Sequence, residues 1–272
     1  MNAADLVHRL GLNETDVLNI YQFGSRVYEC KQDYSSSDWD FIIVVNDSLK
    51  LPDITQHEET STGFSHFEEE SKYSKDPTGS AIIHYHSESV DATIFREFSF
   101  LNAINYFYIP AIESLSLQTI PHIKSKYVWK LTIDYKIPDI NLAHNKSLLR
   151  RSFSAVSDNS FVKCRKKITL HPEQEYVGRK SLWHSLRILL FGCQVAEHNQ
   201  IINFQEANAL YKDIVVDEIP CDDLVFSSVP PPDNCTSWEQ RAVWKWEQYK
   251  KKYTVMKNQL KSRFKSLAPI VK

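Results

Sequence analysis

The sequence of 272 residues lacks a long apolar run, a closely spaced pair of cysteines and an internal repeat. Its longest apolar stretch surrounds ILLFGC at 188–193, far short of the roughly 20 residues that a membrane helix needs. The five cysteines are scattered without a C-x-x-C pair, which argues against a zinc site or a disulfide framework. The first residues, MNAADLVHRLGLNE, contain no apolar core of a signal peptide. We therefore expect an intracellular, cytoplasmic protein without a membrane partner; a nuclear location stays open.

Basic residues are scarce in the first half of the chain and acidic residues are outnumbered in the second, although the net charge is only −2. Residues 1–121 hold 7 Lys and Arg against 19 Asp and Glu, a net of −12. Residues 122–272 hold 25 against 15, a net of +10, and the two halves sum to −2. An acidic half joined to a basic half predicts a polyanionic ligand, with cations on the acidic side. Uneven surface charge that serves solubility alone is the alternative.

The first half of the chain alternates short helices with strands rich in β-branched and aromatic residues. In chain order we expect a helix at 3–10, strands at 17–23, 38–45 and 81–95, and a helix at 96–107 that Pro110 ends. The strand at 81–95 is expected to bend into a hairpin near HSES. Residues 46–80 are expected to form a long connection with room for one strand.

Beyond about residue 140, the pattern changes to long helices. Leu182, Leu186, Leu189 and Cys193 recur at alternating steps of four and three, which predicts one apolar stripe on a helix. Ser237 is expected to cap a last helix of about 30 residues. The sequence thus predicts an α/β (α+β) domain at 1–135, with a small mixed sheet and flanking helices, and an all-helical domain at 140–272.

The stretch FGSRVYECKQDYSSSDWDFIIVV at 23–45 carries the candidate site. Asp38 and Asp40 stand one residue apart at the mouth of an apolar strand, where carboxylates repel each other and lose hydration. Because residues i and i+2 of a strand point to the same face, these two carboxylates should lie side by side. Hard divalent cations such as Mg²⁺ take oxygen ligands of this kind and offset the repulsion. The spacing therefore predicts a metal site, with a solvated strand end as the alternative.

Two further features accompany this pair of aspartates. Gly24 and Ser25 occupy a strand-to-helix turn, where backbone N–H groups can approach a phosphate closely. Arg26 is expected either to support that phosphate pocket or to pair with an acidic neighbour. Asp91, in the apolar strand SVDATIF, is the expected third carboxylate on an adjacent strand. Its competitor, Glu88, is three residues away and faces the other side of a regular strand.

A G-S turn, a D-x-D motif about a dozen residues later and a further strand with one aspartate resemble the DNA polymerase beta-like nucleotidyltransferase superfamily. The resemblance covers about residues 17–95. It extends more loosely to KSLWHSLRILLFGCQVAEHNQIINFQEANAL, which looks like the helical domain that follows the catalytic core in small members of the superfamily.

The resemblance implies a reaction and a role for each motif residue. A nucleoside monophosphate would move from an NTP to a hydroxyl acceptor, with release of pyrophosphate. Asp38 and Asp40 would bridge two Mg²⁺ or Mn²⁺ ions, and Asp91 would hold the ion at the acceptor hydroxyl. Gly24 and Ser25 would hold the β- and γ-phosphates. An inactive member that binds nucleotide without turnover is the open alternative.

The helix predicted at 176–198 carries a basic face beside its apolar stripe. Lys180, His184 and Arg187 fall at positions i, i+4 and i+7 of that helix. We expect Lys180 and Arg187 to contact the phosphates of the nucleotide. A solvated helix face is the alternative, and His184 can equally be a packed core histidine.

The basic half also contains three basic runs, at 146–151, 163–167 and 249–253, with aromatic residues in them or close to them. Cations and aromatic rings together suit RNA phosphates and stacked bases. RNA is therefore the favoured acceptor class, bound through the basic C-terminal half, and small molecules and protein hydroxyls are the alternatives.

Overall fold

The computed structural model describes residues 1–30, 38–49, 59–60, 63–64, 66–69, 83–87, 89–216 and 237–270. The chain forms two compact units, one of Met1–Asp139 with Gln200–Ile202 and one of Ile140–Asn199 with Asn203–Lys272. The predicted ranges, 1–135 and 140–272, assign Gln200–Ile202 to the helical domain, whereas these residues return to the first unit. That return is held by Ile201, whose backbone N–H donates to Ser116 Oγ at 2.9 Å.

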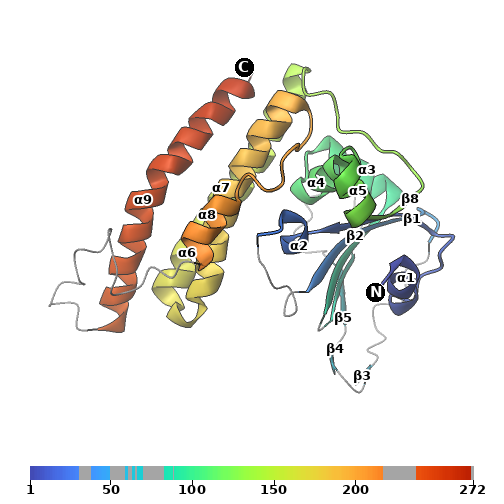
Figure 1. The fold of residues 1–272 in the computed structure, drawn as a ribbon, viewed down its shortest axis with the longest axis horizontal. Helices are drawn as coiled ribbons and strands as arrows, with labels where there is room; N and C mark the ends of the chain where they lie inside the picture. Colours follow the sequence, from blue (N-terminus) through green and yellow to red (C-terminus); the bar gives the residue numbers. More distant parts are fainter. Residues whose placement is uncertain are drawn as a thin grey trace. The chain divides into compact units, whose positions relative to one another are not determined.

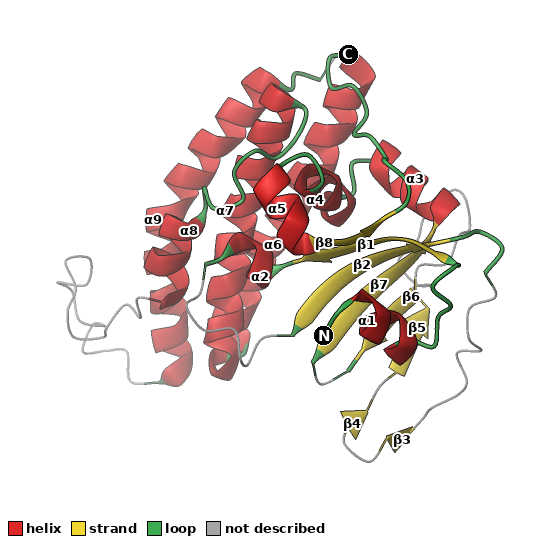
Figure 2. Ribbon diagram, turned by 45° about the vertical axis from the view of Figure 1, so that its right-hand side comes forward, coloured by secondary structure: helices red, strands yellow, loops and turns green. Residues whose placement is uncertain are grey.

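A mixed sheet forms the centre of the first unit (Figure 2). Its strands are β1 (Val17–Phe23), β2 (Trp39–Val45), β5 (His66–Glu69), β6 (Ile83–His86), β7 (Val90–Arg96) and β8 (Val128–Leu131). They lie in the order β5-β6-β7-β2-β1-β8. β2 and β7 run parallel, and the other neighbours are antiparallel. Two short strands, β3 (Glu59–Thr60) and β4 (Gly63–Phe64), pair only with each other.

Helices cover both faces of this sheet, because β2 is apolar on both sides. Phe41 and Ile43 pack toward α1 (Ala3–Arg9), whereas Ile42 and Val44 pack toward α3 (Glu97–Asn105) and α4 (Ile109–Leu117). Two further short helices, α2 (Ser25–Tyr28) and α5 (Pro121–Tyr127), belong to the same unit (Figure 2). The side chains of each strand are thus divided between two separate cores.

Three long helices, α6 (Ala143–Leu170), α7 (Glu175–His198) and α9 (Trp238–Leu267), pack together in the second unit (Figure 1). Shorter pieces join them: η1 (Pro172–Gln174), α8 (Asn208–Tyr211) and η2 (Lys212–Val216). The predicted cap of the last helix is present, since Gln240 N donates to Ser237 Oγ at 3.3 Å. None of the described helices combines the length and the apolar character that a membrane span requires.

The long helices approach each other closely at small residues of α6 and α7. A Cβ on Gly192 of α7 would lie 2.9 Å from Phe264 of α9 and 3.1 Å from Phe153 of α6. Elsewhere between α6 and α7, Ser157 and Ser185 donate to each other's backbone carbonyl at 2.8 and 2.7 Å. These contacts satisfy buried hydroxyls without separating the helices.

The predicted fold class is confirmed: a small mixed sheet with flanking helices is followed by helices alone. The strand predicted at 81–95 is the hairpin of β6 and β7. The role predicted for Pro110 is wrong, because α3 already ends at Asn105 and Pro110 lies in the first turn of α4. The missing N–H of a proline costs no helical hydrogen bond at that position. Most of the connection at 46–80 lies outside the described residues.

Candidate functional site

The register of the sheet brings Asp40 and Asp91 together. Asp40 of β2 and Asp91 of β7 are paired across the parallel strands, whose backbones are about 4.8 Å apart. Both residues are half-buried. By strand alternation both point to the face of Ile42 and Phe95, which α3 and α4 cover. Two carboxylates therefore emerge side by side at the end of this face.

Gly24 lies directly against one of these carboxylates. In the antiparallel pair of β1 and β2, Asp40 is opposite Phe23, the residue before Gly24. Gly24 has φ 79° and ψ −156°, a backbone conformation that is almost confined to glycine. A Cβ at this position would lie 2.1 Å from Asp40 Oδ2. The backbone of the turn thus passes within contact distance of the Asp40 carboxylate, at the point where α2 begins with Ser25 (Figure 1).

Arg26 and Asp38 lie at the entrance to β2. Arg26 Nε donates to the backbone carbonyl of Asp38 at 3.3 Å, and its guanidinium lies over the Trp39 ring, 4.1 Å from the centroid. Asp38 itself is exposed. Arg26 therefore ties the α2 turn to the start of β2, the strand that carries Asp40. The contact of Arg26 with phosphate stays a prediction.

The donor atoms of this site suit a hard divalent cation, because they are carboxylate oxygens. Among the described residues, however, no group of three or more His, Cys, Asp or Glu side chains is placed to hold a metal ion. Asp40 and Asp91 supply a pair, and binding by Asp38 as a third ligand stays a prediction. The competitor Glu88 lies outside the described residues.

Sequence reasoning missed the contacts that hold the α2 turn in place. Tyr28 Oη donates to Glu113 Oε2 of α4 at 2.6 Å, and Glu113 is only 3% exposed. Tyr127 Oη is 3.1 Å from Arg26 O and 2.8 Å from Glu29 Oε1. Glu29 ends α2 with φ 52°, a left-handed conformation that is uncommon for a residue with a side chain. No short motif could have identified these partners, because they are 85 or more residues away along the chain.

The predicted basic face on α7 is partly packed rather than solvated. Arg187 is 4% exposed, and its guanidinium lies 4.9 Å from the Trp183 ring centroid and 5.3 Å from that of Phe191. His184 Nδ1 lies 3.0 Å from Ser160 Oγ of α6. Lys180 is half-buried, with its ammonium 5.7 Å from the Tyr176 ring centroid. Contacts of Lys180 and Arg187 with phosphate stay predictions.

Protonation of His184 is expected to destabilise the fold at acidic pH. Burial, followed by the cations Arg187, Lys163 and Lys180, lowers the pKa of His184 from 6.5 to about 3. Below pH 6.5 the unfolded chain therefore gains a proton that the folded chain takes up only near pH 3. The free energy of unfolding should fall through this window by about 1.4 kcal/mol per pH unit from this group.

Urea unfolding at a series of pH values measures this effect. In His184→Gln, which keeps a hydrogen-bonding group opposite Ser160, the slope should be smaller by about one proton. Equal slopes in the two proteins would show that His184 is charged in the folded state.

Comparisons with known proteins give limited information on this site. No protein-family model matches the sequence, and no curated protein matches it significantly. One similar solved structure is that of a nucleotidyltransferase-like protein from Exiguobacterium sibiricum 255-15. It is 11% identical, the alignment covers 97% of this chain and 77% of that one, and the TM-score is 0.27. A TM-score of this size does not establish a common fold.

Proposed function

We propose that this protein is a metal-dependent nucleotidyltransferase, which moves a nucleoside monophosphate from an NTP to a hydroxyl acceptor. The observation that carries the proposal is the position of Asp40. It is paired with Asp91 across parallel strands and lies against the Gly24 turn. Groups that suit a cation thus adjoin a backbone turn that suits a phosphate.

The metal would be Mg²⁺ or Mn²⁺, held as two ions by Asp38, Asp40 and Asp91. When bound, such ions lower the pKa of an acceptor hydroxyl and neutralise charge on the phosphates. The chain's own residues bind and orient the substrates. Backbone N–H groups at Gly24 and Ser25, together with the Ser25 hydroxyl, hold the β- and γ-phosphates. Because α2 has only four residues, these donors act through hydrogen bonds rather than through a helix dipole.

Asp91 is proposed to accept the proton of the acceptor hydroxyl. The acceptor oxygen then forms a bond to the α-phosphorus, and the bond from that phosphorus to the bridging oxygen breaks. The electron pair of the broken bond leaves with pyrophosphate. Positioning and charge stabilisation supply most of the catalysis in phosphoryl chemistry of this kind.

RNA is the proposed acceptor, because cations are concentrated in the C-terminal half, where the net charge is +10. Small molecules and protein hydroxyls are the competing acceptors. Lys180 and Arg187 are proposed to contact phosphates from the helical unit.

Incubation with each NTP in turn, labelled at the α-phosphate, tests the proposed function. The protein is given Mg²⁺ or Mn²⁺ and then total RNA, a protein extract or a pool of small metabolites. The expected result is label in the RNA fraction together with release of pyrophosphate. Label in the protein or metabolite fraction would keep the enzyme class and change the acceptor.

Absence of pyrophosphate release with every NTP and acceptor would contradict the enzyme. Nucleotide binding without release, measured by calorimetry, would then identify an inactive nucleotide-binding module. If the protein neither binds nucleotide nor releases pyrophosphate, the carboxylate pair has no role in nucleotide chemistry.

A further inference from the structure

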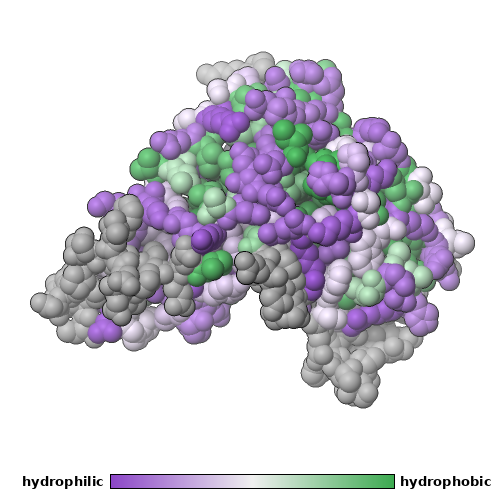
Figure 3. Space-filling model, in the orientation of Figure 1, coloured by the Kyte–Doolittle hydropathy of each residue, from purple (hydrophilic) through white to green (hydrophobic). Residues whose placement is uncertain are grey.

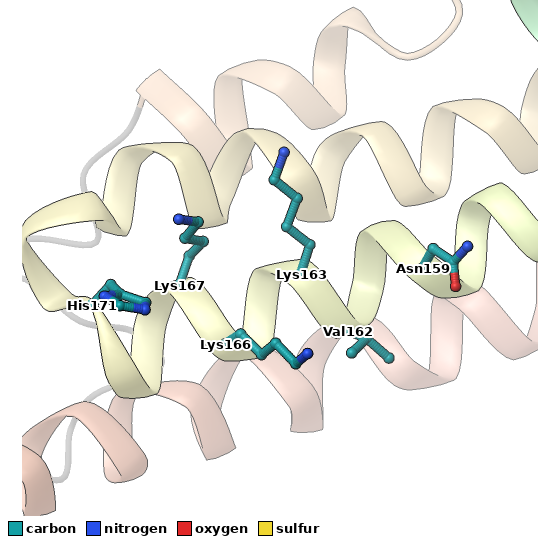
Figure 4. A pocket seen from close by; sticks show the side chains of 6 residues that line it. All are labelled: Asn159, Val162, Lys163, Lys166, Lys167 and His171. Atoms are coloured by element: carbon teal, nitrogen blue, oxygen red, sulfur yellow. The ribbon is translucent and has the colours of Figure 1, made fainter. Parts of the chain in front are cut away.

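The second half of α6 lies beside two hollows in the helical unit. The smaller, of about 380 Å³, is lined by Asn159, Val162, Lys163, Lys166, Lys167 and His171 (Figure 4). The larger, of about 830 Å³, is lined by residues of both α6 and α9. Val162 and Lys166 line both hollows. The two hollows therefore join into one surface, which we call the α6 surface.

Cations of α6 line both hollows and outnumber the two acids of the larger one, Glu239 and Glu247 of α9. The helix contains seven Lys and Arg and a single acidic residue, Asp158. Lys257 and Lys261 of α9 bind that aspartate, each at 2.7 Å, so it neutralises α9 instead of α6. Lys163 and Lys166 are exposed, and neither pairs with an acid among the residues that the structure describes. Figure 4 shows Lys163 and Lys167 extending from one side of the helix and Val162 from the other.

The positive charge continues from α6 to α7. His184 of α7 is acted on by Lys163 of α6 and by Lys180 and Arg187 of α7, and all three cations lower its pKa. No acid of the described chain is among the groups that shift this imidazole. Neighbouring cations attract an anion that carries several charges.

The larger hollow adds aromatic and apolar side chains to the cations. Trp238, the first residue of α9, is 54% exposed, and Leu170 of α6 is 62% exposed. Phe161 and Trp246 also line this hollow and pack edge to face, with ring centroids 5.4 Å apart. An exposed indole therefore lies on the same surface as Lys166.

We infer that the α6 surface binds single-stranded RNA, with phosphates on Lys163 and Lys166 and a base stacked on Trp238. Proteins that bind single strands combine a cationic groove for the backbone with aromatic rings for the bases. A double helix keeps its bases stacked inside and offers none to an indole. The inference rests on the proposed function and names the binding site of its acceptor.

A membrane surface fits the same residues less well. Helices that bind lipid present a protruding apolar face, whereas Trp238 and Leu170 line a hollow between two helices. On the face drawn in Figure 3, coloured apolar residues lie in small groups among hydrophilic ones. The cations and the ring thus suit a flexible polyanion with flat bases.

The test measures binding of fluorescein-labelled oligouridylate to the full chain by fluorescence anisotropy, without NTP or metal. Lys163→Glu/Lys166→Glu is expected to bind about tenfold more weakly or worse. The slope of log affinity against log salt should fall by about 1.4, because each phosphate contact of a single strand contributes about 0.7. Trp238→Ala should bind about tenfold more weakly, and Trp238→Phe should regain most of the affinity.

The matched control is Lys124→Glu/Lys265→Glu, which makes the same charge change on exposed lysines that line neither hollow. It should bind within about threefold of the wild type, since these lysines line neither hollow and salt screens the attraction between exposed charges that are not in contact. Equal loss in the two double variants would overturn the inference, and so would tighter binding to anionic lipid vesicles or to an acidic protein than to oligouridylate.

Asp40→Asn separates this inference from the proposed function. It should bind oligouridylate with unchanged affinity and transfer nucleotide about 10³-fold more slowly or worse. If the wild-type protein binds RNA but transfers no nucleotide, the proposed function alone is overturned. If Lys163→Glu/Lys166→Glu transfers nucleotide to RNA at the wild-type rate, this inference alone is overturned.

Discussion

Replacing Asp40 by Asn is expected to lower kcat/KM for nucleotidyl transfer by about 10³-fold or more. Asp40 is paired with Asp91 in the register of the sheet, and its carboxylate contacts the Gly24 turn. An amide of the same shape keeps the packing but removes the negative charge that holds a cation. A loss of about 4 kcal/mol of transition-state stabilisation corresponds to this factor. Pyrophosphate release under single-turnover conditions measures it directly.

Stability measurements show whether such a loss comes from unfolding. Without metal, Asp40→Asn removes repulsion between two neighbouring carboxylates, so its free energy of unfolding should be equal to or higher than that of the wild type. Addition of Mg²⁺ and NTP should raise the melting temperature of the wild type and leave that of the variant unchanged.

Asp47→Asn is the matched control, with the same change at the other end of β2. Asp47 Oδ1 accepts a hydrogen bond from Phe98 N at 3.0 Å, and an asparagine oxygen can accept the same bond. This variant should keep transfer within about twofold, since a surface substitution that keeps its bond usually costs about 0.5 kcal/mol or less. Transfer by Asp40→Asn at the level of this control would exclude a catalytic role of the carboxylate pair.

The strands that carry the site were predictable because their patterns are local. β1 has the predicted bounds of 17–23, and β2 begins at Trp39, one residue inside the predicted 38–45. Both strands are apolar on two faces, so a polar residue at a strand end stands out. The pairing of Asp40 with Asp91 follows from the parallel alignment of β2 and β7, which the sequence implies only through the resemblance to nucleotidyltransferases.

Contacts between distant segments could not be predicted in the same way. Glu113 lies in an apolar helix, and nothing in its neighbours indicates a bond to Tyr28. The basic run at 249–253 suggests a surface for RNA, yet Lys250 pairs with Glu247, and Lys252 pairs with Asp213 at 2.9 Å. The first pair is local, three residues apart on α9. The second joins segments 39 residues apart, and such a pair depends on how helices pack, which charge counts along a sequence do not contain.

Gly24→Ala is expected to reduce both stability and transfer more than Gly11→Ala, the same change at another glycine with positive φ. The φ of 79° and ψ of −156° lie in a region that residues with a side chain avoid. The new Cβ would also lie 2.1 Å from Asp40 Oδ2 and 3.1 Å from Asp40 Cβ, far inside the usual contact distance of about 3.5 Å.

Gly11→Ala separates these two effects. Gly11 has φ 64°, and a Cβ there would meet nothing within 4 Å. This control should lose about 1–2 kcal/mol of unfolding free energy through its left-handed backbone and keep its transfer rate. Gly24→Ala should lose about 2 kcal/mol more through overpacking. Urea unfolding of the two variants measures the difference.

The overpacking at Gly24 can be relieved in two ways, and each disturbs the site. If the turn moves, Ser25 and the phosphate-binding N–H groups move with it. If the Asp40 carboxylate rotates away, it leaves the position beside the Gly24 turn, because Asp40 Cβ is fixed by the strand. A shift of about 1 Å in a positioning group can cost a factor of about 10² in rate. Gly24→Ala should therefore transfer nucleotide about a hundredfold more slowly while Gly11→Ala does not, and equal rates would mean that neither phosphates nor metal are bound at this turn.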